Sequence, residues 1–216
     1  MKVIITLVFA LCAMPALAQN LDCRLSALGG AVYGRSQHVH SSGYEFTDPF
    51  DVNGAAAGAG FGCLAARNRF RYGAALDWMH TTAVGNTQER APNEDFFAET
   101  AFDWLATMRV IGGYQLDPRV LLYVTGGVGF SAVKIRVCAV SGPGAGVCGT
   151  SSANLWGLVA GVGAQVRLWQ HWSLSAEYIG FAFENKDFPA PVPFLDRGGG
   201  VQPEAHVVRA ALNFHF

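Results

Sequence analysis

The side chains that could do chemistry are a few carboxylates, histidines and cysteines scattered through an otherwise apolar chain. Asp103 and Glu177 lie in apolar stretches, where paired carboxylates could act as general acid and base. His38, His40 and His80 could bind haem or a divalent metal, or belong to a serine–histidine constellation. These histidines lack the spacing of a metal or haem motif, and no orienting group accompanies them. The sequence therefore predicts no enzyme, no catalytic residue and no cofactor, with the three histidines kept as alternative ligand candidates.

The first eighteen residues predict an exported protein. MKVIITLVFALCAMPALA has Lys2, a short apolar stretch and Ala16-Leu17-Ala18, the layout of a secretory signal peptide. Residues 1–18 are therefore expected to be a signal peptide, and residues 19–216 a single domain. The chain has a net charge of −1 and no cluster of Lys or Arg, so a nucleic acid is not expected as a partner.

Disulfides are possible because the predicted compartment is oxidising. Cys138 and Cys148 flank AVSGPGAGV inside one predicted loop, which predicts a bridge that closes it. Cys23 and Cys63 lie near the same end of two strands that should be neighbours. They could form a second bridge or pack as two apolar thiols.

The elements that must position these residues are strands. Apolar residues alternate with period two in eight segments, near 26–37, 55–66, 69–82, 100–116, 120–136, 153–168, 172–185 and 204–216. Connections after the second, fourth and sixth segments are tight (RNR, LDPR, WQHW), whereas the others are long. Outer-membrane barrels have an even number of strands, short turns at one end and long loops at the other. This pattern favours an all-β fold, an eight-stranded antiparallel up-and-down transmembrane β-barrel, over a soluble β-domain.

The two faces of the strands predict what fills the barrel. In FDWLATMRVIGGYQL, Phe102, Trp104 and Met108 share one face, and Asp103 and Arg109 the other. In a membrane barrel the apolar face meets lipid and the charged face meets the lumen. The predicted lumen charge network is Asp77, Asp103, Arg109, Glu177 and Arg209. An eight-stranded barrel is just wide enough for side chains to fill, so these charges could form a packed plug or, alternatively, line a small gated pore.

Three blocks of the second half resemble one family. DWLATMRVIGGYQLDPRVLLYVTGGVGFSAVK, GLVAGVGAQVRLWQHWSLSAEYIGFAFEN and HVVRAALNFHF are similar to the central block, the following hairpin and the closing strand of the porin-family outer-membrane immunogenic barrels of Gram-negative bacteria. The first strands match in composition only, and Ala211 and Phe214 depart from the family's usual Gly and Tyr. The resemblance implies an OmpA-like barrel that supports the envelope and displays surface loops; some members form pores or bind haemin.

The last ten residues, VVRAALNFHF, predict the closing strand of the barrel and its signal for assembly into the outer membrane. Phe214 and Phe216 alternate with polar residues up to the end of the given sequence. The resemblance implies that this aromatic strand is the signal read by the outer-membrane assembly machinery. The expected setting is a monomer in the outer membrane of a Gram-negative bacterium, with periplasmic termini and extracellular loops. Its expected partners are outer-membrane lipids, lipopolysaccharide and that machinery.

Overall fold

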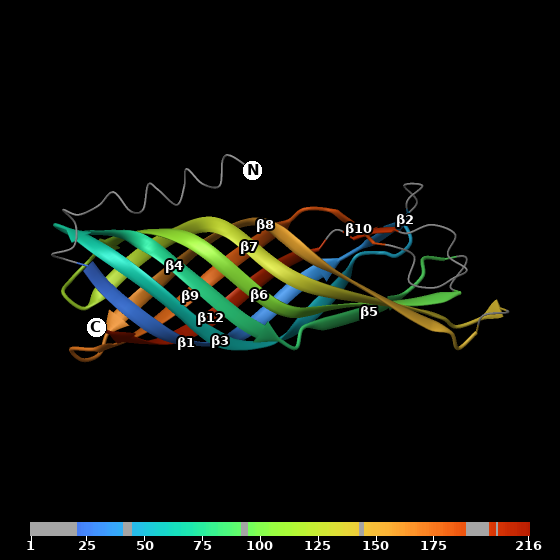
Figure 1. The fold of residues 1–216 in the computed structure, drawn as a ribbon, viewed down its shortest axis with the longest axis horizontal. Helices are drawn as coiled ribbons and strands as arrows, with labels where there is room; N and C mark the ends of the chain where they lie inside the picture. The colour runs from blue at the N-terminus through green and yellow to red at the C-terminus, as the bar shows by residue number, and fades with distance from the viewer. Residues whose placement is uncertain (1–20, 41–44, 92–94, 143–144, 189–198, 202) are drawn as a thin grey trace.

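The computed structural model shows one closed antiparallel barrel of eight long strands (Figure 1). It describes residues 21–40, 45–91, 95–142, 145–188, 199–201 and 203–216. The predicted signal peptide lies outside these residues. The barrel strands are β1 (Leu21–Ser36), β3 (Phe50–Arg67), β4 (Phe70–Thr81), β6 (Phe96–Gln115), β7 (Val120–Ala139), β8 (Cys148–Arg167), β9 (Trp172–Phe183) and β12 (Glu204–His215).

Every barrel strand is paired on both sides, so the barrel has no open edge. Neighbours in sequence pair along the wall, and β1 closes the circle by pairing with β12 as well as with β3. The amide of Phe216 donates to the carbonyl of Cys23 at 3.0 Å, which extends this closure to the last residue. Closure satisfies the backbone polar groups that a lipid environment could not. The fold class predicted from alternation and loop lengths is therefore confirmed.

Four short strands lie beyond the far end of the barrel. We call the end with the tight connections at 68–69, 116–119 and 168–171 the turn end; the C-terminus lies there (Figure 1). At the opposite, far end, β5 (Val84–Gln88) pairs with β6, and β2 (His38–His40), β11 (Gly199–Val201) and β10 (Lys186–Phe188) form a small separate sheet. Within the described ranges, no helix is long and apolar enough to cross a membrane.

Several residues expected in long loops belong to strands instead. β3 begins at Phe50, β7 continues to Ala139 and β8 begins at Cys148. The connection between β7 and β8 is therefore only residues 140–147, shorter than predicted. Small and polar residues interrupt the apolar alternation in these stretches, so periodicity did not predict them as strands. They form strands because their backbones pair with a neighbouring strand.

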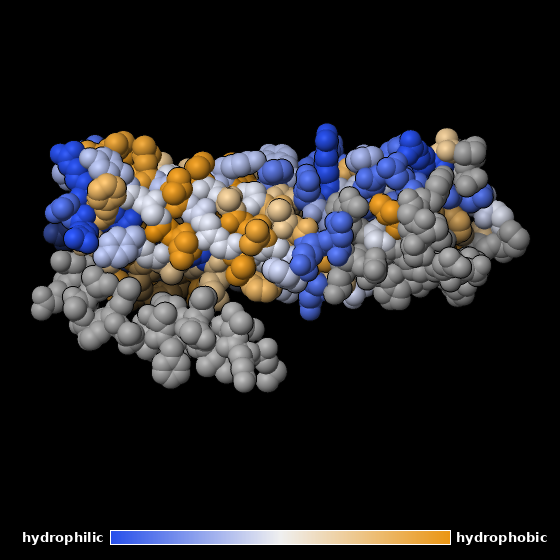
Figure 2. Space-filling model, turned by 90° about the horizontal axis from the view of Figure 1, so that it is seen from above, coloured by the Kyte–Doolittle hydropathy of each residue, from blue (hydrophilic) through white to orange (hydrophobic). Residues whose placement is uncertain are grey.

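The outer wall near the turn end is apolar. Outward side chains there are exposed and large: Leu25, Phe61, Leu76, Val110, Val124, Leu158, Val162, Leu174 and Leu212. Figure 2 shows apolar residues gathered over this half, between a hydrophilic turn end and hydrophilic patches farther along. Exposed aromatic side chains flank the band, with Phe70 and Trp172 towards the turns and Trp78 and Trp156 on the other side. Such aromatic girdles are typical of a barrel's two membrane interfaces.

The polarity of the two faces reverses beyond this band. On β7, Val124 and Phe130 point outward, but farther along the outward residues are Lys134 and Arg136, while Val133 and Ile135 point inward and are buried. β3 behaves alike, with Asp51 outward and Val52 inward. An apolar interior under a polar exterior is the arrangement of a β-structure in water. The reversal therefore marks the level at which the strands leave the hydrocarbon.

A β-bulge between Phe102 and Trp104 explains why two predicted orientations, those of Phe102 and Asp103, are wrong. The register of β6 against β7 shifts there, so residues on the two sides of Asp103 do not follow strict alternation. Phe102 points inward and is 1% exposed, although it was expected on the lipid face. Asp103 was expected in the lumen, but it lies half-exposed and pairs with exposed Lys134. Alternation read from sequence cannot anticipate an inserted residue.

Candidate functional site

Four of the five charges predicted for the lumen form one buried cluster, which we call the polar layer: Asp77 on β4, Arg109 on β6, Glu177 on β9 and Arg209 on β12. Their side chains are at most 6% exposed. They come from strands on opposite sides of the barrel, and their inward positions follow from the period-two alternation. The fifth predicted member, Asp103, lies outside the cluster because of the bulge.

Each carboxylate in the polar layer is shared between both arginines. Asp77 Oδ2 accepts from Arg209 Nη2 at 3.0 Å and from Arg109 Nη2. Glu177 Oε2 accepts from Arg209 Nε at 2.7 Å, and its Oε1 from Arg109 Nη1 at 3.4 Å. Two buried cations and two buried anions therefore compensate one another, which is the condition for keeping charges out of water.

Neutral hydroxyls complete the polar layer. Thr107 donates to Asp77 Oδ2 at 3.0 Å and accepts from Arg109 Nε at 3.1 Å. Thr125 lies 3.4 Å from Arg109 Nη1. The alternation that predicts Arg109 in the lumen predicts Thr107 there as well, whereas Thr125 was missed because its strand shows no clear apolar face in the sequence.

A glycine faces each of the four charges on a neighbouring strand. Directly cross-strand pairs are Gly60 with Asp77, Gly127 with Arg109, Gly163 with Glu177 and Gly30 with Arg209. A Cβ at Gly60 would lie 2.3 Å from Asp77 Oδ1, and one at Gly30 would lie 2.8 Å from Arg209 Cβ. Gly60 and Gly30 thus leave volume that Asp77 and Arg209 occupy, whereas a Cβ at Gly163 would meet the Tyr123 ring and one at Gly127 the Met108 carbonyl.

A polar chain continues from this layer to the turn end. Ser26 donates to Asn213 Oδ1 at 2.7 Å, and Arg24 bonds to Gln165 across the lumen. Closer to the turn end, Asp22 pairs with Arg167 at 2.7 Å and with His215 at 2.8 Å. Arg24 and Asp22 were not among the predicted lumen residues, because the first strand is too rich in Gly and Ala to orient from sequence.

The lumen on the other side of the polar layer is filled by apolar side chains, which we call the apolar layer. Its buried members include Leu28, Val32, Phe50, Val52, Phe102, Leu105, Val133, Ile135, Leu155, Ile179, Phe181 and Val207. Phe102, Val32 and Val133 are each at most 1% exposed. These residues form a hydrophobic core of the kind found inside soluble β-proteins.

Little space remains along the lumen. A cavity beside the polar layer, reaching from Arg24 to Arg209, has about 10 Å³. A second one, where Asp77 and Ile179 meet at the boundary of the two layers, also has about 10 Å³. A space of this size holds roughly one water at most. The polar layer and the apolar layer therefore fill most of the barrel, and a smaller apolar cluster lies near the turn end: Leu64, Ala75, Ile111, Leu121 and Tyr123.

Two of the histidines proposed as ligands, His38 and His80, lie in different surroundings. His38 is buried at the far end, where its Nε2 lies 2.7 Å from Thr100 Oγ1 and its ring packs edge-on against Phe50. Burial lowers the pKa of His38 to about 4. His80 is exposed on the wall, and His40 lies on β2. Among the described residues no group of three His, Cys, Asp or Glu side chains could hold a metal ion.

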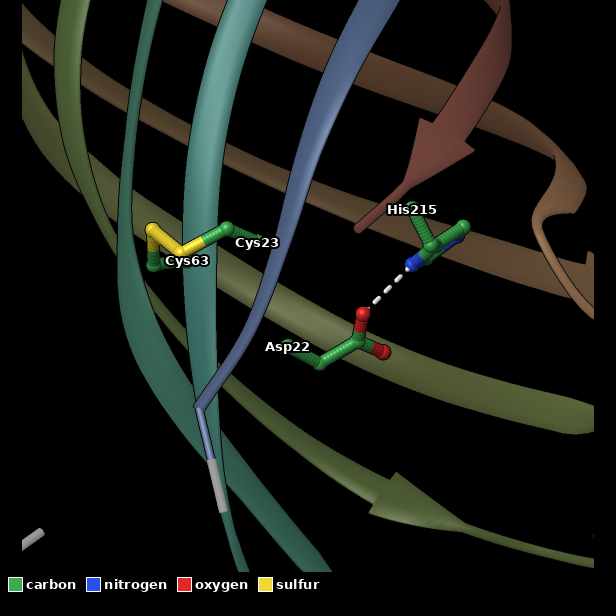
Figure 3. Close-up of a disulfide and its surroundings, with 4 residues drawn as sticks. All are labelled: Asp22, Cys23, Cys63 and His215. Atoms are coloured by element: carbon green, nitrogen blue, oxygen red, sulfur yellow. Dashed lines mark hydrogen bonds and ion pairs between the residues drawn. A yellow bond between two sulfur atoms is a disulfide. The ribbon is translucent and has the colours of Figure 1, made fainter. Parts of the chain in front are cut away.

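Two disulfides join neighbouring strands at opposite ends of the barrel. Cys138 and Cys148 bridge β7 and β8 at the far end, with Cα atoms 4.1 Å apart, which confirms the predicted pair. Cys23 and Cys63 bridge β1 and β3 at the turn end, resolving the alternative that the sequence left open. Figure 3 shows this second bridge beside the Asp22–His215 contact.

The terminal phenylalanines lie at the turn end on the outer wall. Phe214 is 39% exposed and packs edge-on against Trp172 at 5.2 Å between ring centroids. Phe216 follows β12 and is 63% exposed. Their position beside the closing seam fits an aromatic strand end at a membrane interface.

Three known proteins that this chain resembles in sequence or in shape are outer-membrane proteins. The 31 kDa outer-membrane immunogenic protein of Brucella melitensis is 26% identical over 198 residues, covering 87% of this chain and 80% of that protein. The outer-membrane protein OprG of Pseudomonas aeruginosa superposes with a TM-score of 0.56 at 10% identity, over 91% of this chain and 96% of OprG. The outer-membrane protease OmpT of Escherichia coli gives 0.55 at 10% identity, over 92% and 97%.

The structural likenesses establish the fold and leave the chemistry to the residues of this chain. The sequence-family model for the outer-membrane protein β-barrel domain matches residues 4–216, nearly the whole chain. That match agrees with the closed barrel, its apolar band and its aromatic girdles. The chain is a member of the outer-membrane protein β-barrel domain family.

Proposed function

We propose that this protein is a sealed, non-enzymatic barrel that contributes to the integrity of the outer membrane and displays its far end outside the cell. The observation that carries this proposal is the filled lumen. The polar layer links four strands by ion pairs, and the apolar layer closes the space beyond it. A barrel with a packed interior resists deformation and adds no leak to the membrane.

The proposed orientation places the turn end and both termini in the periplasm. Support comes from the length of the strands, since β6, β7 and β8 each run for 20 residues. A transmembrane strand needs only about 9–11 residues. The surplus lies at the far end, where the outer wall is polar and the interior apolar, as suits a projection into water.

The partners that we propose are outer-membrane lipids, lipopolysaccharide and the assembly machinery. The exposed apolar band would meet lipid tails, and Phe214 and Phe216 would provide the assembly signal. A monomer is proposed because the barrel closes on itself and leaves no strand edge to be paired.

Conductance across a planar lipid bilayer tests the sealed lumen. The folded protein should give no reproducible single-channel steps, because neither lumen cavity admits more than about one water. The matched control is the same preparation left unfolded. Steps of constant size that require folded protein would overturn the plug and favour the small-solute channel.

Epitope tags on living cells test the orientation. A tag after Ser141, in the β7–β8 connection, should bind antibody on intact cells. The control is a tag after Asp117, in the tight turn between β6 and β7, which should bind only after the outer membrane is opened. The reverse pattern would contradict the proposed topology.

A further inference from the structure

A polar groove of about 390 Å³ lies on the outer wall, across β12, β1 and β3. Its side chains form two rows of three on neighbouring strands. His206, Tyr33 and Asn53 make the row nearer the turn end. Glu204, Arg35 and Asp51 make the row beyond it. Residues two apart on a strand share a face, so all six point outward together.

The groove lies directly above the apolar band. The next outward residues towards the turn end on these three strands are Val208, Ala31 and Ala55. The groove thus stands at the level where the outer wall changes from apolar to charged. In the proposed orientation this is the headgroup layer of the outer leaflet, which presents sugars and phosphates rather than acyl chains.

The groove has unsatisfied capacity for hydrogen bonds. Arg35 Nε is 3.6 Å from Asp51 Oδ1, and both side chains are more than two-thirds exposed. Within the described part of the chain, Glu204 has no ion-pair partner. Elsewhere on the outer wall, between β6 and β7, Lys134 and Asp103 are 2.7 Å apart. The polar groups of the groove are therefore more open to a ligand than that pair.

An aromatic surface lies among these polar groups. The Tyr33 side chain is 52% exposed. Next to it, the His206 ring stacks on Tyr178 with an interplanar angle of 12°, and the Tyr178 hydroxyl lies 2.8 Å from His206 Nδ1. This bond holds the histidine ring in place beside Tyr33. Flat amphipathic rings suit a ligand with one apolar and one polar side.

The charges limit the chemistry of the ligand. The groove has two carboxylates, Asp51 and Glu204, against one guanidinium, Arg35, which disfavours a phosphate or sulfate. The groove's carboxylates and histidine do not form a group able to hold a metal ion. A free apolar chain would bury the charged groups without compensation. A neutral sugar ring satisfies carboxylate, amide and guanidinium groups with its hydroxyls and stacks its C–H face on tyrosine.

We propose that this groove binds a neutral sugar ring of a glycolipid headgroup in the outer leaflet. Tyr33 supplies the stacking surface, and Asp51 and Glu204 accept hydrogen bonds from the sugar hydroxyls. The volume of the groove falls in the range of small-ligand sites. This inference rests on the proposed function for its membrane level, but not on whether the lumen is sealed.

The test uses the full-length folded protein in phosphatidylcholine nanodiscs. One probe is the core oligosaccharide released from rough lipopolysaccharide by mild acid, titrated by calorimetry. The other is intact rough lipopolysaccharide incorporated into the nanodiscs, counted per barrel by native mass spectrometry. Tyr33→Ala and Asp51→Asn should each raise the Kd for the oligosaccharide about tenfold or more and lower the bound lipopolysaccharide. Tyr72→Ala, which removes another exposed outward tyrosine, should leave both values within twofold.

The two probes separate the possible sources of the sugar. Binding of both supports recognition of the sugar itself, and binding of intact lipopolysaccharide alone, still lost in Tyr33→Ala, supports a membrane-held headgroup. Equal binding by wild type and the groove variants in both measurements would overturn the proposal. If Tyr33→Ala does not fold, as judged by heat-modifiable electrophoresis, Glu204→Gln takes its place. Conductance of the same preparations reports on the sealed lumen separately.

Discussion

The lumen on the turn side of Ile179 and the lumen beyond it are both occupied by buried side chains, but of different kinds. On the turn side, Asp77 and Glu177 share two buried arginines. Beyond it, aliphatic and aromatic side chains pack against one another without charge. The outer wall has the opposite polarity to the lumen at each level: it is apolar around the charged part of the lumen and polar around the apolar part. At each level, β3 and β7 therefore have one apolar face, and the surroundings outside the barrel decide whether that face points outward or inward.

This comparison separates two forms of stability. The polar layer depends on a balance of charge, so removing one member leaves the others uncompensated in a buried site. The apolar layer depends on volume, so its losses should scale with the atoms removed. Inward neighbours on β9, Glu177 and Ile179, lie on the two sides of the boundary and allow a matched test.

The largest expected effect follows from removing one carboxylate of the polar layer. Glu177→Ala leaves Arg109 and Arg209 to share Asp77 alone, and should lower the free energy of unfolding by about 3–5 kcal/mol. Urea unfolding in detergent micelles, followed by tryptophan fluorescence, measures the change. Glu184→Ala, an exposed carboxylate just after β9, is the control and should change stability little. A loss below about 1 kcal/mol for Glu177→Ala would show that the charges contribute little to holding the barrel together.

Substitutions at Ile179 should produce a smaller and graded effect. Ile179→Val should cost about 1 kcal/mol and Ile179→Ala about 3 kcal/mol, because the loss follows the number of buried methyl groups removed. Glu177→Gln, by contrast, should be nearly as harmful as Glu177→Ala, since the charge is lost in both. The same urea series measures all four variants. A graded response at Glu177, or an abrupt one at Ile179, would remove the distinction between the layers.

Acid should weaken the far end through His38. Burial lowers the pKa of His38 to about 4, below the ordinary value near 6.5. Between these two pH values the unfolded chain binds a proton that the folded chain does not, so this contribution to stability is lost as pH falls from 6.5 to 4. The loss should be on the order of 2–3 kcal/mol.

His38→Gln isolates that contribution. The free energy of unfolding of wild type and variant is measured at pH 7.5, 5.5 and 4.5. The difference between them should change through this window, since Gln does not titrate. A constant difference across the three pH values would show that His38 takes up its proton as readily in the folded chain as in the unfolded one.

Much of the barrel could be predicted from sequence, because alternation and loop length are local signals. Four charges were correctly expected on the lumen side: Asp77, Arg109, Glu177 and Arg209. Each lies between two apolar residues that point outward. Their convergence into one layer depends on the stagger of the strands around the closed barrel, which no single strand encodes. The glycines at 30, 60, 127 and 163 contribute to the high glycine content of the sequence. That each one lies directly across from a charged residue could be seen only from the strand register.

The apolar layer was missed for a physical reason. An inward apolar face and an outward apolar face give the same period of two, so alternation cannot tell where a strand leaves the hydrocarbon. On β7 the informative residues were Lys134 and Arg136, which lie on the face that Val124 and Phe130 occupy nearer the turn end. A change of polarity along one face is the sequence signal for the membrane boundary. The bulge at Asp103 obscured the same signal on β6.

The smallest expected effect concerns the charge pair that lies outside the lumen. Lys134 and Asp103 are 2.7 Å apart, a contact as short as those in the polar layer, but their side chains are 55% and 32% exposed. Water already solvates both groups, so pairing them should contribute at most about 0.5–1 kcal/mol. A double-mutant cycle with Lys134→Ala and Asp103→Ala measures the coupling, and 1 M NaCl should abolish most of it. A coupling above about 2 kcal/mol, insensitive to salt, would mean that the bulge pair is shielded from water and that burial does not distinguish it from Arg109 and Asp77.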